Sequence, residues 1–154
     1  VCNLVRPGII MYGYEACNST LNKIKLYPTT KLKSKISFIK TVEKGTSISY
    51  GRTFVAEKEM KIATVGIGYA DGIRRELSNK GEVVINGKKA SIVGTICMDS
   101  FMVDITDIDA KIGDDVFIWD NDIIKLEDVA KKCNTINYEI LSTISDRVPR
   151  VFTE

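Results

Sequence analysis

One tyrosine in this sequence has neighbours that are typical of a catalytic base. Tyr50 stands between Ser49 and the pair Gly51-Arg52, so a phenol lies beside a flexible glycine and a permanent cation. A nearby positive charge lowers the pKa of a phenol and makes its oxygen a better proton acceptor near neutral pH. The alternative is that Tyr50 only packs at the end of a strand.

Histidine is absent from all 154 residues. This absence excludes a Ser-His-Asp triad, a Cys-His dyad and a zinc site with imidazole ligands within this chain. Any acid or base that the chain supplies must be a Tyr, Lys, Cys, Asp or Glu side chain.

Two glycine-containing segments could approach a ligand. In Arg6-Pro7-Gly8-Ile9, the glycine would let backbone N–H groups come close to a phosphate, although the same residues could simply begin a strand. The run from Gly66 to Gly72 is glycine-rich as well, but its spacing does not follow G-x-G-x-x-G. We therefore do not predict a dinucleotide site.

Two further groups are better explained by structure than by chemistry. Cys97 could be a nucleophile only if a cation activated it, so a buried structural thiol is the preferred interpretation. The aspartates between Asp104 and Asp115 lack the EF-hand spacing and its final Glu, which favours a solvated face. No metal site is predicted.

Composition favours one soluble domain. The net charge is +2, hydrophobic residues make up 44% of the chain, and Lys and Arg are scattered among acidic residues. This pattern predicts no contact with nucleic acid or membrane from this segment. The four cysteines form no C-x-x-C pair, which indicates reduced thiols and a cytoplasmic location. The chain opens without Met, so we expect a piece of a longer protein, and a membrane anchor upstream stays open.

The elements that would position these residues are mainly strands. Alternating polarity predicts a strand over residues 32–42 with Leu32, Ile36, Phe38 and Val42 on its buried side, and a turn at 44–45 that returns the chain through 46–50. Further strands are expected at 60–69, 90–98, 101–105 and 115–119, and a hairpin is expected over 83–90 with a type I′ turn at Asn86-Gly87.

Helical spacing appears only late in the chain. Apolar residues from Leu126 to Cys133 follow a helical repeat, and Asn137 is predicted as the N-cap of a second short helix that runs to Ile144. Successive strands without intervening helices exclude a doubly wound fold. The predicted fold class is therefore mainly β: an antiparallel, barrel-like C-terminal domain with one or two short helices near its end.

Taken in order, five groups of residues resemble the C-terminal part of bacterial alanine racemases, in the alanine/serine racemase family. They are 5–13 (VRPGIIMYG), 42–54 around SYGRT, 67–72 (IGYADG), 93–99 (VGTICMD), and TINYE with RVPRV at 135–139 and 147–151. The resemblance covers essentially the whole chain.

The resemblance implies a division of the chain into three parts. Residues 1–12 would be the last strand of an otherwise absent (β/α)8 barrel, 13–31 a linker, and 32–154 the C-terminal β domain. The family works as a head-to-tail homodimer in which this β domain covers the barrel of the other subunit. It uses pyridoxal 5′-phosphate, held by a lysine that would lie outside this chain.

The resemblance also implies a role for each matching residue. Tyr50 would be one of two bases that interconvert L- and D-alanine, supplying D-alanine for peptidoglycan, and the lysine would be the other. Arg6 would contact the pyridine nitrogen and keep it unprotonated, while Gly8 and Ile9 would offer backbone N–H groups to the phosphate. The backbone of Met98 would hold the substrate carboxylate, and Tyr69 would narrow the entrance. Other residues expected along the approach are Arg75, Asp99 and Ile144.

Two positions depart from the family pattern. Asp146 replaces a tyrosine that often precedes Arg-Val-Pro-Arg, and Thr95 stands where an entrance arginine is common. Either the differences are neutral or they widen the pocket. Because membrane-anchored serine racemases of vancomycin resistance carry a small polar residue at the Asp146 position, a serine or serine/alanine racemase is the alternative. A third possibility is that the isolated chain is a non-catalytic dimerisation or binding module.

Overall fold

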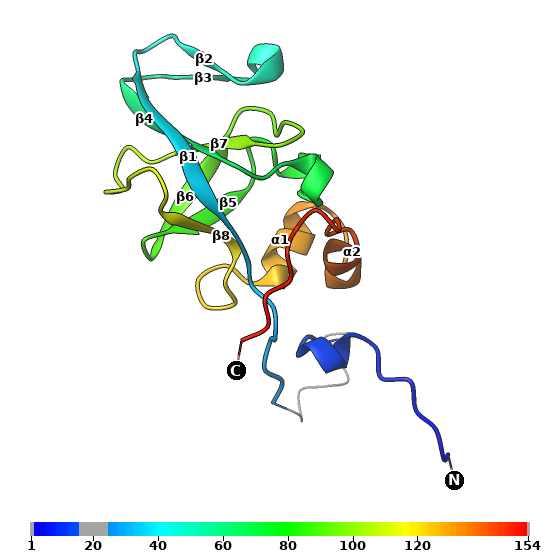
Figure 1. Ribbon diagram of the computed structural model, residues 1–154. Helices are drawn as coiled ribbons and strands as arrows, with labels where there is room; N and C mark the ends of the chain where they lie inside the picture. Colours follow the sequence, from blue (N-terminus) through cyan, green and yellow to red (C-terminus); the bar gives the residue numbers. More distant parts are fainter. Residues whose placement is uncertain (1, 16–24, 154) are drawn as a thin grey trace.

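The computed structural model describes residues 2–15 and 25–153. Its centre is a closed antiparallel barrel with the strand order β1-β4-β7-β6-β5-β8 (Figure 1). These strands are β1 (Leu32–Val42), β4 (Met60–Val65), β5 (Glu82–Ile85), β6 (Lys88–Val93), β7 (Phe101–Asp104) and β8 (Asp115–Trp119). The architecture confirms the predicted fold class.

The barrel is filled by side chains from every strand. β-branched and aromatic residues alternate inward along the strands, and burying them removes apolar surface from water, which is the main force that closes the barrel. Fully buried members of this core include Ile36, Val65, Val83, Ile85, Phe101, Val103 and Val116.

Strand β1 closes the barrel because it pairs with β8 through its first half and with β4 through its second half. Its bounds agree with the predicted 32–42. The prediction that Phe38 lies on the buried side was wrong, since 54% of its surface is exposed. The register shifts between Ile36 and Phe38, and this irregularity reverses the alternation, so that Ile39 packs against the core instead.

A small second sheet projects beyond one end of the barrel (Figure 1). It consists of β2 (Ser47–Ile48) and β3 (Phe54–Val55), which pair antiparallel. The predicted return strand over 46–50 was therefore wrong beyond Ile48, because the backbone turns at Ser49 and forms a 3₁₀-helical turn at Tyr50–Arg52. A separate apolar cluster joins the sheet to the barrel: Val42, Ile48, Ala56, Met60, Ile62 and Val93.

The turn between β5 and β6 confirms the predicted hairpin. Asn86 and Gly87 both have positive φ, at 49° and 75°, as a type I′ turn requires. Two predicted strands are shorter than expected. β4 ends at Val65 rather than residue 69, and β6 ends at Val93 because Gly94 adopts φ 80°.

Two short helices follow the barrel, as predicted. Helix α1 (Leu126–Lys132) buries Leu126, Val129 and Ala130 on one face. Helix α2 (Asn137–Ser142) is capped by Ile136, so the prediction that Asn137 is the N-cap was wrong. The Asn137 amide instead donates to the carbonyl oxygen of Glu15, 3.3 Å away, and so ties α2 to the N-terminal segment.

That N-terminal segment, residues 2–15, contains a 3₁₀-helical turn at Ile9–Tyr12 and no strand. The assignment of 1–12 to a barrel strand stays a prediction, since a strand needs paired neighbours and those would lie outside this chain. The proposed linker also stays a prediction, and its residues 16–24 lie outside the described ranges. No helix in the described part of the chain is long and apolar enough to cross a membrane.

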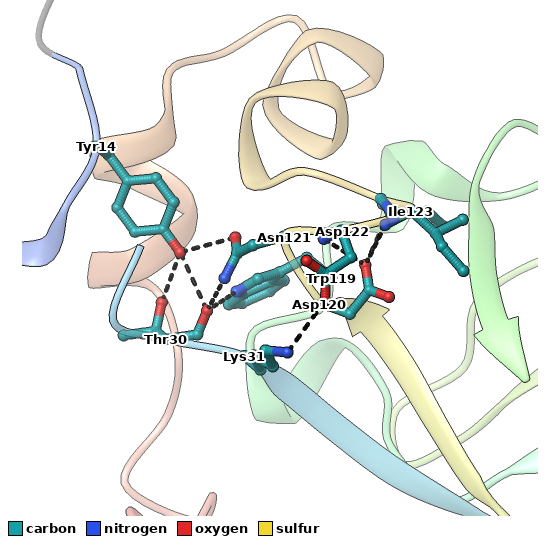
Figure 2. A network of polar contacts seen from close by, with 9 residues as sticks. Tyr14, Thr30, Lys31, Trp119, Asp120, Asn121, Asp122 and Ile123 are labelled. Carbon is teal, nitrogen blue, oxygen red and sulfur yellow. Dashed lines mark hydrogen bonds and ion pairs between the residues drawn. The ribbon is translucent and has the colours of Figure 1, made fainter. Parts of the chain in front are cut away.

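A polar network attaches this segment to the barrel (Figure 2). The Tyr14 hydroxyl lies 3.1 Å from the Thr30 carbonyl oxygen, 2.9 Å from Thr30 Oγ1 and 3.2 Å from Asn121 Oδ1. The same carbonyl accepts hydrogen bonds from Asn121 Nδ2 and Trp119 Nε1, at 2.6 and 3.2 Å. Only 1% of Tyr14 is exposed, and burial raises the pKa of its phenol.

Candidate active site

Five of the predicted site residues meet in one open depression beside the β2–β3 sheet. It has a volume of about 660 Å³. The predicted residues that line it are Tyr50, Tyr69, Arg75, Met98 and Asp99. Thr95, Ile96, Cys97 and Ser100 complete the lining. Residues about fifty positions apart in the sequence are thus brought together.

Tyr50 occupies an unusual turn at the rim of this depression. Ser49, Gly51 and Arg52 all have positive φ, at 64°, 75° and 51°. Such conformations are costly for residues with a Cβ atom and persist only where surrounding contacts hold them. The turn leaves 76% of Tyr50 exposed. A phenol in this position is available to a ligand rather than used for packing.

The loops that carry Tyr69 and Met98 are tied to each other by their backbones. The N–H groups of Tyr69 and Ala70 donate to the carbonyl oxygens of Cys97 and Met98, both at 3.0 Å. A Cβ atom on Gly68 would lie 2.3 Å from the Met98 oxygen. This close approach explains the glycine at position 68, which lets the two loops pack together.

Ion pairs brace the same two loops from the C-terminal side. Arg147 places Nη2 2.6 Å from Asp99 Oδ1 and Nε 3.4 Å from Asp71 Oδ1. The hydrogen bond to Asp99 raises the pKa of the Arg147 guanidinium. Asp71 is buried and also accepts the Gly68 N–H at 2.9 Å. Sequence reasoning missed this contribution of Arg147, because its partners lie 48 and 76 positions away.

Cys97 takes part in this arrangement through neutral hydrogen-bond partners. Its Sγ lies 3.5 Å from Ser49 Oγ, and its N–H donates to the Ser100 carbonyl oxygen at 2.9 Å. The thiol is half-buried at the depression, so the prediction that it is buried was wrong. These contacts are compatible with the structural role that the sequence favours.

The two remaining approach residues do not line the depression. Ile144 packs against the main core, and Asp146 is exposed in the segment after α2. The carbonyl oxygen of Ile144 accepts a hydrogen bond from Arg150 Nη2 at 2.9 Å. Neither residue is therefore part of the lining around Tyr50 in this single chain.

The predicted cofactor ligands are also separated from the depression. Arg6, Gly8 and Ile9 belong to the N-terminal segment, which lies at the opposite end of the molecule from β2 and β3 (Figure 1). Arg6 and Gly8 are exposed, whereas Ile9 is buried and anchors the segment. Tyr138 of α2 lies beside Gly8, with its hydroxyl 3.8 Å from where a Cβ would be, although sequence reasoning gave it no role.

Comparison with known proteins shows which family this chain resembles. Residues 29–152 match the family described as "Alanine racemase, C-terminal domain". An alanine racemase of Halothermothrix orenii is 46% identical over 154 residues, covering 97% of this chain and 41% of that protein. The chain thus spans about two fifths of the length of its relatives.

Solved structures agree with this result. An alanine racemase of Clostridium difficile 630 is 46% identical and superposes with a TM-score of 0.89, over 95% of this chain and 39% of that one. An alanine racemase of Bartonella henselae, solved with covalently bound pyridoxal phosphate, is 37% identical with a TM-score of 0.88, over 96% of this chain and 41% of that one.

Proposed function

This chain belongs to the alanine racemase C-terminal domain family, and from that premise we propose that it is the part of a pyridoxal-phosphate-dependent alanine racemase that supplies one of the two catalytic bases. Tyr50 is that base. The observation that carries the proposal is the exposed Tyr50 phenol in a depression that it shares with Tyr69, Met98 and Asp99.

The residues of the N-terminal segment fit a phosphate-bearing cofactor. Arg6 offers a permanent positive charge, and Gly8 is exposed, with the Tyr138 ring close to it. Burial of the Ile9 side chain holds this backbone in place. When bound, pyridoxal phosphate would withdraw electrons from the substrate and weaken its Cα–H bond. The task of this chain is then to hold that group and to move the proton at the Tyr50 oxygen.

The separation of these two regions supports a dimer. Tyr50 and the Arg6 segment lie at opposite ends of one chain, so they cannot act on one substrate within it (Figure 1). In the proposed homodimer, the depression around Tyr50 closes over the barrel of the other subunit. Each substrate site then uses cofactor-binding groups from one subunit and Tyr50 from its partner.

The test is hydrogen exchange at the substrate Cα in deuterated water. In the full-length dimer, Tyr50→Phe should slow racemisation strongly. It should also stop deuterium uptake by one enantiomer, while the other still exchanges with retained configuration through the lysine. The asymmetry follows because each base serves one face of the substrate. If both enantiomers exchange at the wild-type rate, the proposal is wrong. Tyr27→Phe is the matched control, because Tyr27 is exposed and does not line the depression.

Because the proposal places only one of the two bases in this chain, it predicts that the chain alone does not racemise alanine. Incubating the isolated 154-residue chain with pyridoxal phosphate and L-alanine should leave the L-enantiomer unchanged, because the second base lies outside it. Formation of D-alanine at a rate above that of the free cofactor would show that the chain carries both bases.

Alanine is the proposed substrate, and serine is the alternative. The exposed carboxyl group of Asp146 favours a roomier and more polar pocket than a tyrosine ring would leave. To decide between the two substrates, kcat/KM for serine and for alanine is measured in wild type and in Asp146→Tyr, and the ratios are compared. If Asp146 admits serine, the variant should lose serine racemisation and keep alanine racemisation. If the ratio does not change, this position does not set the preference.

A further inference from the structure

The turn that presents Tyr50 needs external support. Ser49 combines φ 64° with ψ −179°, a region that residues with a Cβ atom rarely occupy, and Arg52 has φ 51°. The Tyr50 side chain is largely in solvent, so few side-chain contacts of its own direct it. Because the phenol oxygen lies at the far end of a rigid side chain, a small change in this backbone displaces it considerably. The contacts of the turn therefore decide where the oxygen points.

Those contacts converge on Thr95. Its Oγ1 donates to the Tyr50 carbonyl oxygen at 2.9 Å, and its own carbonyl oxygen accepts a hydrogen bond from Ser49 Oγ at 2.6 Å. Its Oγ1 also lies 3.3 Å from Thr53 Oγ1. One residue thus holds the turn before, at and after Tyr50.

Thr95 is itself anchored firmly. Only 9% of its surface is exposed, and the next residue, Ile96, is fully buried in the main core. Asn79 closes a ring of hydrogen bonds around it, because its Oδ1 accepts the Gly94 N–H at 2.6 Å and its Nδ2 donates to Thr53 Oγ1 at 3.0 Å. The hydroxyl group of Thr95 is therefore a fixed point to which the strained turn is attached.

We propose that Thr95 is a positioning residue for Tyr50, whose hydroxyl group fixes the turn so that the phenol oxygen reaches the substrate Cα in the geometry that proton transfer requires. The inference rests on the proposed function, since it assumes that Tyr50 is a base. Misplacing a reacting group by about 1 Å can lower a rate about a hundredfold. Removing one of several contacts should cost less, on the order of tenfold.

The experiment compares three variants of the full-length dimer. Thr95→Val keeps the shape of the side chain and removes the hydroxyl group, whereas Thr95→Ser keeps the hydroxyl group. Thr106→Val is the matched control. The part-buried Thr106 hydroxyl accepts a hydrogen bond from the Lys61 N–H and donates one to the Asp104 carboxylate, and neither partner belongs to the Tyr50 turn. Thermal unfolding of each variant shows whether the fold is retained.

We expect Thr95→Val to lower kcat about tenfold with KM within about twofold, and Thr95→Ser to stay within about threefold of wild type. Because the two enantiomers have equal free energy, kcat/KM must fall equally in both directions. Deuterium uptake at Cα separates the bases, and Thr95→Val should slow it only for the enantiomer that Tyr50 serves. Thr106→Val should destabilise the protein without this asymmetry.

Three results would overturn the role of Thr95: wild-type kcat in Thr95→Val, equal slowing of exchange for both enantiomers, or an equal loss in Thr95→Ser. Failure of the proposed function looks different. In that case Tyr50→Phe itself produces no asymmetry between the enantiomers. If Tyr50→Phe is asymmetric and Thr95→Val is not, Tyr50 remains the base and only the positioning role is wrong.

Discussion

Two tyrosines at opposite ends of this domain are held in opposite ways. Tyr14, at the junction with the N-terminal segment, is 1% exposed, and its hydroxyl group lies within hydrogen-bond distance of Thr30 and Asn121. Tyr50, at the rim of the depression, is 76% exposed, and among the described residues it is the backbone of Tyr50 that Thr95 holds. A phenol that joins parts of a fold has a saturated oxygen. A phenol that is to exchange protons needs a free oxygen on a fixed backbone.

The sharpest test of this contrast is the same substitution at both positions. Tyr50→Phe should lower racemisation by about 10²–10⁴-fold, the usual contribution of a general acid or base, and leave the unfolding temperature unchanged. Steady-state kinetics and thermal unfolding of the full-length dimer measure both effects. A large loss of stability in Tyr50→Phe would mean that its hydroxyl group is structural after all.

The glycine beneath the Tyr50 turn offers the next test. A Cβ on Gly94 would lie 2.7 Å from Ser49 Cβ and 2.8 Å from the Ile48 oxygen, at φ 80°. Gly94→Ala should therefore destabilise the protein by about 1–3 kcal/mol and lower kcat as the turn shifts.

Gly87→Ala is the control for Gly94→Ala, because Gly87 has φ 75° with open space around its Cβ position. It should show the conformational cost alone, about 1 kcal/mol, with unchanged kcat. Denaturant unfolding and kinetics distinguish the two. Equal effects of both substitutions would contradict a special contact between Gly94 and the turn.

At the other end of the domain, removal of the buried hydroxyl should affect stability and spare catalysis. Tyr14→Phe leaves the Thr30 and Asn121 groups without one partner, which should cost about 1–2 kcal/mol of unfolding free energy. Racemisation should stay within about twofold of wild type. Tyr27→Phe, at an exposed position, should change neither quantity. A kcat loss in Tyr14→Phe without loss of stability would show that this junction also controls the active site.

The smallest expected effect is a pH dependence. Burial raises the pKa of Tyr14 above that of the unfolded chain, so the folded state retains a proton that the unfolded state releases. Stability is therefore full below about pH 10 and falls as the pH rises through the folded pKa. Wild type should lose more unfolding free energy than Tyr14→Phe between about pH 9 and 11. Cys133, whose pKa burial raises to about 11, is present in both proteins and cancels in the difference.

The sequence predicted those parts of the fold that depend on local pattern. Strands β1 and β8 have the expected bounds, and Asn86-Gly87 forms the expected turn, because alternation and positive-φ residues act over a few positions. Phe38 and Asn137 were assigned wrongly for one reason. A register shift in the pairing with β4 exposes Phe38, and the Asn137 amide is used in a hydrogen bond to Glu15. Both effects depend on residues that are distant in the sequence.

For the candidate site, the ordered motifs by themselves determined the family and pointed to Tyr50, Tyr69, Arg75, Met98 and Asp99 as a group. Only the tertiary structure decided how these residues are held. A short segment of sequence does not predict the strained turn at Tyr50. The conformational cost of that turn is offset by contacts with Thr95, which lies 45 positions away in the chain. Likewise, only the folded chain separates Tyr50 from the Arg6 segment, because the barrel stands between the two ends that carry them.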